Sequence, residues 1–219
     1  MSIILRQVHY FGILALFSCI FLPVTALSNS FSAKIQDSKG KPVEDAVVAL
    51  LPESPEIFSK NHEEKTAIMD QVDKQFTPHV LAVRAGTTVS FPNSDNIRHH
   101  VYSFSEVKIF EHKLYSKDEK KTVLFDKPGI VVLGCNIHDS MVGYIYVADT
   151  PFFSVSDARG NTAINMLPRG DYKLHIWHPR QKAKSSLPFG KITISDAPFK
   201  TTLVLKIKSK KKRERVNWY

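Results

Sequence analysis

The 219-residue chain has only 2 cysteines and 4 methionines, and its longest apolar run covers the 12 residues 11–22. A transmembrane helix needs about 20 apolar residues, so this run is too short to span a bilayer. It follows Arg6, the only charged residue before the small residues that end at Ala26. This order is typical of a cleaved export signal. The sequence therefore predicts a signal peptide at 1–26 and a periplasmic location.

Two other readings of this segment stay open. Cys19 could end a lipoprotein signal, or an uncleaved segment could remain as a membrane anchor. Cleavage after Ala26 would remove Cys19 and leave Cys135 as the sole cysteine. Exported proteins normally pair their cysteines, so an unpaired Cys135 indicates a role other than a disulfide. A buried, inert thiol is the alternative.

No segment after the signal has the period of an amphipathic helix, and no repeat array is present. Apolar residues alternate instead, as in Phe31, Ala33 and Ile35, and a run over 203–207 ends the pattern. Alternation of this kind, interrupted by short turn sequences, predicts an all-β sandwich architecture. About 190 residues remain after cleavage, enough for one large or two small domains.

Negative charge is scarce at the C-terminal end. The formal net charge of the chain is +9, and residues 206–219 hold seven Lys or Arg and one Glu. The rest of the mature chain is therefore nearly neutral. We expect residues 208–219 to form a basic tail that contacts an acidic redox partner or anionic lipid, or that has no partner. Nucleic acid is not an expected partner of an exported chain.

A group of metal-binding residue types lies in one predicted loop between two strands. Cys135, His138 and Met141 follow each other at three-residue steps, and His99 and His100 lie about 36 residues upstream. A thiolate, two imidazoles and a long axial thioether form the ligand set of blue-copper sites. Adjacent residues of a strand point to opposite faces, so only one of His99 and His100 can point inward. The sequence predicts one bound copper ion.

Several other interpretations of these residues remain. A lone Met141 is more often a core residue, and a lone His138 is more often a surface residue. Zinc also binds Cys and His, but a structural zinc site needs a fourth strong ligand in place of Met141. His175 and His178 could form a second metal site, although an exposed strand face and a strand end are the simpler interpretation.

Residues 66–148 resemble the cupredoxins, the family that includes plastocyanin and amicyanin. The resemblance lies in Phe76–Asn93, in the His99-His100-Val101 step and in the Cys-x₂-His-x₂-Met spacing, which is amicyanin-like. The chain resembles exported bacterial proteins named methylamine utilisation proteins more closely still. The resemblance implies a cupredoxin Greek-key sandwich at 66–149, one type 1 copper ion and electron transfer. The ligands it implies are His99, Cys135, His138 and Met141.

One position departs from the cupredoxin pattern. Cupredoxins usually carry Asn directly after the first ligand histidine, where it ties the two ligand loops together. Here His100 takes that position. Either His100 provides the tether, or Asn93, Ser94 or Asp95 does.

The flanking segments resemble a second family. Residues 27–65 with 150–207 are similar to carboxypeptidase regulatory-like, transthyretin-type β-sandwiches, through the turn sequences at 40–43, 157–161 and 168–172. These motifs specify strand starts and turns, and they carry no chemistry. The resemblance implies a discontinuous sandwich into which the cupredoxin domain is inserted.

The predicted function is that of an exported electron carrier without catalysis of its own, which exchanges electrons with protein partners. A periplasmic copper-binding or delivery protein is the main alternative, but such proteins favour Met-rich or His-rich segments, and the methionines here form no cluster. A binding module with a decayed copper site is a third. Multicopper oxidases need further His-x-His pairs, and the chain contains none.

Overall fold

The computed structural model describes residues 29–54, 65–181 and 187–208. Within these ranges the chain is all-β, as its alternation predicted, and holds 17 strands. The described residues include no helix with the length and apolar character needed to cross a membrane. The predicted signal peptide at 1–26 and residues 209–219 of the predicted tail lie outside the described residues.

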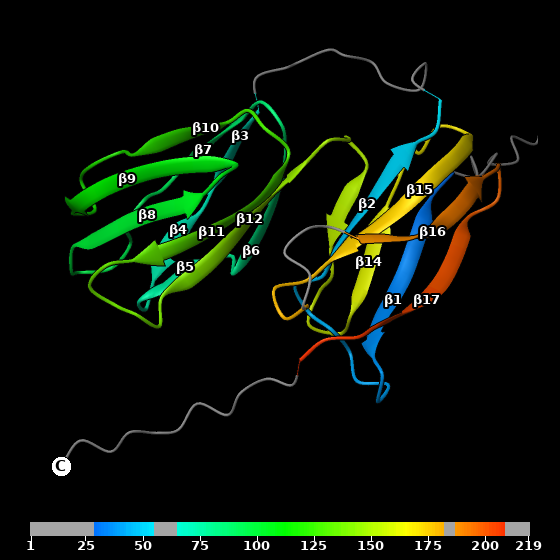
Figure 1. The fold of residues 1–219 in the computed structure, drawn as a ribbon, viewed down its shortest axis with the longest axis horizontal. Helices are drawn as coiled ribbons and strands as arrows, with labels where there is room; N and C mark the ends of the chain where they lie inside the picture. Colours follow the sequence, from blue (N-terminus) through cyan, green and yellow to red (C-terminus); the bar gives the residue numbers. More distant parts are fainter. Residues whose placement is uncertain (1–28, 55–64, 182–186, 209–219) are drawn as a thin grey trace, which may run out of the picture.

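The strands are short and are joined by turns, and Figure 1 shows them gathered into two bodies. In chain order they are β1 Phe31–Asp37, β2 Val47–Pro52, β3 Thr66–Ile68, β4 Asp70–Val72, β5 Gln75–Thr77, β6 Val80–Arg84, β7 Thr87–Ser90, β8 His99–Ser105, β9 Lys108–Tyr115, β10 Thr122–Phe125, β11 Gly129–Cys135, β12 Val142–Ala148, β13 Phe153–Val155, β14 Asn161–Ile164, β15 Gly170–Trp177, β16 Leu187–Ile194 and β17 Phe199–Leu205.

Strands β3 to β12 form the first sandwich. Its sheets have the orders β6-β12-β11-β8-β9 and β10-β7-β3, and the hairpin β4-β5 lies beside them. Strand β12 runs parallel to β6 and β3 runs parallel to β7, whereas the other pairs are antiparallel. Alternate residues of the two sheets point inward and meet in one apolar core. This is a two-sheet β-sandwich. Its core includes Val89, Phe91, Val101, Phe125, Val131, Leu133 and Ile145.

The second sandwich is built from the chain before and after the first. Its sheets have the orders β13-β2-β15-β16 and β14-β1-β17. Their inward residues form a separate core, with Phe31, Ile35, Leu50, Tyr172 and Leu203 among its members. The transthyretin-type resemblance of these segments remains a prediction.

The two sandwiches share a third apolar cluster. Trp177 on β15 packs against Tyr144 and Tyr146 on β12, with ring centroids 5.6 and 6.1 Å apart. Val47 and Ala49 of β2 belong to the same cluster. The outer faces of two sheets therefore pack together, on the side of β12 opposite to the core of the first sandwich.

The last strand is shorter than its apolar pattern predicted. The run over 203–207 predicted a strand to its end, but β17 stops at Leu205. Strand β17 pairs with β1, and the final pair joins Leu205 to Asp37, where β1 also ends. Residues beyond Leu205 have no β1 residue opposite them to pair with, so the strand ends. Ile207 still packs on the core.

Candidate metal centre

Strand β11 and the loop after it carry three of the four predicted ligands. Cys135 is the last residue of β11, His138 lies in the loop, and Met141 directly precedes β12. The loop turns tightly, because His138 N donates to Cys135 O at 3.4 Å and Met141 N donates to His138 O at 2.9 Å. Cys135 and Met141 are buried and His138 is half-buried. The short loop thus returns all three side chains to one end of the sandwich.

Strand β8 brings the remaining ligand to the same place. Cys135 pairs with Val101, and the register of β8 shifts between His99 and Val101. Such a bulge redirects side chains locally. His99 is fully buried at 0% exposure. His100 points to the other face, where its Nε2 lies 2.8 Å from Glu111 Oε1.

The thiol and the two imidazoles meet at one point. Cys135 Sγ lies 3.7 Å from His99 Nδ1 and 3.8 Å from His138 Nδ1. The three ligand atoms all lie within 4.8 Å of one another, and no other such group of His, Cys, Asp or Glu occurs in the described part of the chain. Ligands that bind one ion at about 2.0–2.3 Å in a trigonal plane are separated by about 3.7 Å. The three residues therefore fit a shared metal ion.

Met141 lies in the apolar core of the first sandwich. Its side chain is 1% exposed and belongs to the same apolar cluster as Cys135. Its position at the end of the ligand loop, with its backbone bonded to His138, fits a fourth ligand on the buried side.

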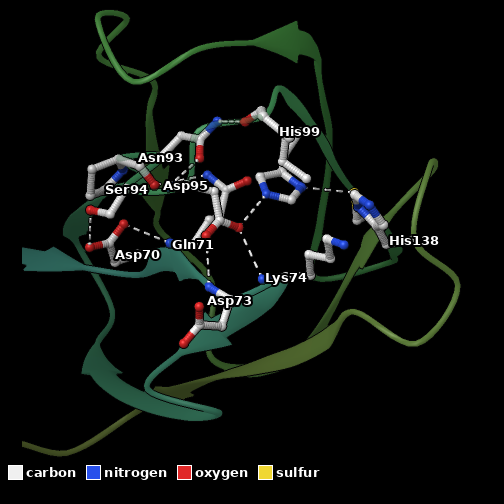
Figure 2. Close-up of polar contacts among 12 residues, drawn as sticks. Asp70, Gln71, Asp73, Lys74, Asn93, Ser94, Asp95, His99 and His138 are labelled. Carbon is white, nitrogen blue, oxygen red and sulfur yellow. Dashed lines mark hydrogen bonds and ion pairs between the residues drawn. The ribbon is translucent and has the colours of Figure 1, made fainter.

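Asp95 holds the far side of the His99 ring (Figure 2). The Asp95 Oδ2 atom lies 2.7 Å from His99 Nε2 and accepts a 2.9 Å bond from Lys74 N. Oδ1 accepts a 2.7 Å bond from Asp73 N. Burial raises the pKa of Asp95, but these bonds outweigh it and the pKa falls below its ordinary value. A carboxylate at Nε2 makes that nitrogen the donor, which leaves the Nδ1 lone pair free to face Cys135.

The two segments that carry the predicted ligands are held by bonds of several different groups. Asn93 is 1% exposed, and its Nδ2 donates to Ile97 O at 2.8 Å and to Tyr115 O at 3.1 Å. The two ligand segments are joined directly by a 3.1 Å bond from Asn136 N to His100 O. Among the predicted candidates, Asn93 fixes the loop before His99, and His100 contributes its backbone carbonyl.

A buried polar network under this loop was missed by sequence reasoning. Tyr115 OH donates to Phe91 O at 2.9 Å and accepts a bond from Gln71 Nε2, which also lies 2.8 Å from Pro92 O. Burial raises the pKa of Tyr115, which therefore stays neutral. Alternation marks Tyr115 as an inward strand residue, but nothing in the sequence pairs it with Gln71, which lies 44 residues away.

His138 is the one member of the metal-binding group that reaches the surface. Burial lowers its pKa, as does the nearby charge of Lys74. The Lys74 side chain extends towards it in Figure 2. Ile97 and Ile137, from the two ligand segments, are 40% and 46% exposed. The end of the sandwich thus presents an imidazole edge with apolar and basic neighbours.

The predicted second site at His175 and His178 is not part of any such group in the described residues. His178 is buried at 4% exposure after the end of β15. Its Nε2 lies 3.1 Å from Glu44 O, and its Nδ1 accepts a 2.9 Å bond from Arg180 N. Both ring nitrogens are used by the backbone, so His178 is a structural residue.

Comparison with known proteins gave matches only among solved structures: no protein-family model and no curated protein matches the chain. The copper-containing nitrite reductase from Thermus scotoductus SA-01 matches with a TM-score of 0.38 and 28% identity, over 45% of this chain but only 25% of that one. The purple cupredoxin from Nitrosopumilus maritimus matches with a TM-score of 0.34 and 20% identity, over 39% of this chain and 100% of that one. A reduced amicyanin variant matches with a TM-score of 0.36 and 21% identity, over 46% of this chain and 98% of that one.

Proposed function

We propose that this chain is an exported type 1 copper protein that carries single electrons. His99, Cys135 and His138 would hold the ion, with Met141 as a weak axial ligand. The observation that carries the proposal is the buried Cys135 thiol with an imidazole Nδ1 on either side, at 3.7 and 3.8 Å. Bound copper supplies a one-electron couple between Cu(II) and Cu(I), and His₂Cys with a long axial Met is its type 1 ligand set.

The protein keeps these ligands in place whether or not an electron is present. His99, Cys135 and Met141 are 0%, 3% and 1% exposed, and two of them extend directly from strands of the packed sandwich. A close-packed core resists rearrangement, which limits reorganisation when the charge changes. The surface edge of His138 gives an electron a short route between the site and a docked protein.

The ligand set favours copper over zinc. A structural zinc site closes with four strong Cys, His or carboxylate ligands, whereas the group here has three in the described residues. The residue left to complete it is Met141, a thioether that suits copper. We propose that this group of His99, Cys135 and His138 serves a carrier without catalysis of its own.

The partners are proposed to be periplasmic redox proteins with an acidic docking face. Lys74 extends towards His138, and Arg98 is exposed next to His99 in the sequence. The apolar residues Ile97 and Ile137 suit a contact that forms and releases readily. The basic tail, outside the described residues, would add attraction to an acidic partner or to a membrane surface.

The test is the visible and paramagnetic-resonance spectrum of the mature protein loaded with Cu(II). A type 1 site gives an intense blue charge-transfer band from the Cys135 thiolate and narrow copper hyperfine splitting, and Cys135→Ala is expected to remove both while the protein stays folded. A reversible one-electron wave should accompany the colour. A colourless copper-loaded protein would contradict the carrier function and favour copper binding or delivery instead.

A further inference from the structure

The side chain of Asp95 is held more firmly than an ordinary loop carboxylate. Its two oxygens together contact the His99 ring, at 2.7 Å, and the amides of Asp73 and Lys74, at 2.7 and 2.9 Å. Only 14% of the side chain is exposed. Three donors therefore converge on one carboxylate, and one of them is the imidazole whose other nitrogen faces Cys135.

The amide donors come from an unusual turn. Asp73 and Lys74 connect β4 to β5, and their φ angles are +54° and +59°. Left-handed backbone at both central positions defines a type I′ hairpin turn. Consecutive amides in such a turn cannot swing away without losing the pairing of Val72 with Gln75. The turn therefore fixes the orientation of the Asp95 carboxylate.

The hairpin is joined to the Asp95 loop by further bonds. Ser94 N donates to Gln71 O at 3.0 Å, and Ser94 Oγ donates to Asp70 Oδ2 at 2.8 Å. These contacts position the loop without touching His99. Several bonds thus attach the loop of Ser94 and Asp95 to the hairpin. Among the bonds of this paragraph and the two before it, only the one from Asp95 to the His99 ring involves a predicted metal ligand.

We propose that Asp95 is the positioning residue of His99, holding Nε2 as the donor and Nδ1 towards Cys135, and that its charge lowers the reduction potential of the site. This inference rests on the proposed copper function. A carboxylate behind a ligand histidine fixes the ring and raises its basicity. A negative charge close to the site also stabilises the more positive Cu(II) state over Cu(I). Removing it should therefore favour reduction.

The test compares Asp95→Asn with Asp70→Asn. Both remove one carboxylate that links the same loop to the same hairpin, but only the first touches the His99 ring. For Asp95→Asn we expect the Cu(II) affinity to fall about 10- to 100-fold relative to the Cu(I) affinity. Each tenfold change raises a one-electron potential by about 59 mV. Asp70→Asn should change the potential by less than a third of the shift that Asp95→Asn produces. Equal shifts in both variants would overturn the proposal.

A second measurement needs no copper. Nitrogen shifts of His99 in the metal-free protein above pH 7 should show a protonated Nε2 and an unprotonated Nδ1. Asp95→Asn should mix the two tautomers, and Asp70→Asn should not. A wild-type protein with Nδ1 protonated would overturn the proposal. Because this readout is independent of the metal, a colourless copper-loaded protein would contradict the electron-carrier function without deciding the role of Asp95.

Discussion

Each sandwich contains a buried histidine, and the two differ in what their ring nitrogens face. His178 in the second sandwich is 4% exposed, and its two ring nitrogens bond to the backbone of Glu44 and Arg180. His99 in the first is 0% exposed, and its Nδ1 faces a thiol instead. Burial of a histidine therefore says little about function. A ring nitrogen that faces a second metal-binding atom, with the other nitrogen anchored, distinguishes a ligand from a structural residue.

The largest expected effect separates His99 from its neighbour. His99→Ala removes a ligand atom from the buried group, and we expect it to abolish the blue absorption. His100→Ala is the matched control, because His100 points outward to Glu111 on the other face of β8. It should keep the blue band and shift it only slightly. The absorption spectra of the two copper-loaded variants provide the measurement, and the reverse result would make His100 the ligand.

The next prediction asks whether the second sandwich supports the metal centre or only the fold. Trp177 is 3% exposed and packs on Tyr144 and Tyr146 across the shared cluster. Trp177→Ala should lower the free energy of unfolding by about 3–5 kcal/mol, the usual cost of emptying a large aromatic site. The copper spectrum should not change, because Trp177 contacts the face of β12 that carries Tyr144 and Tyr146, whereas Met141 and the inward residues of β12 belong to the core of the first sandwich.

Denaturant unfolding of the metal-free protein measures how much Trp177→Ala lowers the free energy of unfolding. Phe104→Ala is the control, because Phe104 is 77% exposed and its removal should change the free energy by about 0.5 kcal/mol or less. If Trp177→Ala alters the blue band, the second sandwich helps to shape the site and the separation drawn between the two bodies is wrong.

The third prediction uses the pH dependence of stability to test His178 as a structural residue. Burial lowers the pKa of His178 to about 4 from its ordinary 6.5. Between these values the unfolded chain binds a proton that the folded chain does not, so stability falls as the pH is lowered. From pH 7 to pH 5 the metal-free protein should lose about 2 kcal/mol through this residue.

His178→Gln retains a side-chain donor and acceptor but does not titrate in this range. The loss of stability between pH 7 and pH 5 should therefore be smaller in the variant by about 2 kcal/mol. Comparing the two losses removes the contributions of the other histidines, which both proteins share. An identical pH dependence in the two proteins would show that folding does not lower the pKa of His178, and that burial and the backbone bonds do not hold it neutral.

Local patterns predicted the strands better than they predicted the contacts. Alternation identified an all-β chain and placed His99 and His100 on opposite faces, because side-chain direction along a strand follows from the backbone alone. The end of β17 at Leu205 depended on where its partner β1 stops, which a local pattern does not contain. The roles of Asp95 and Tyr115 depend on the β4-β5 hairpin and Gln71, which only folding brings close.

The smallest expected effect concerns Met141, the one predicted ligand with a thioether. Met141→Leu nearly conserves volume, so its cost to stability should stay below about 1.5 kcal/mol. If Met141 donates weakly to Cu(II), its removal should keep the blue colour and raise the potential, because Cu(II) loses more than Cu(I). Met141→Gln adds a harder oxygen donor at the same place and should lower the potential. Voltammetry of both variants gives the two shifts, at about 59 mV for each tenfold change in relative affinity. Potentials that match the wild type in both variants would make Met141 a core residue like its apolar neighbours.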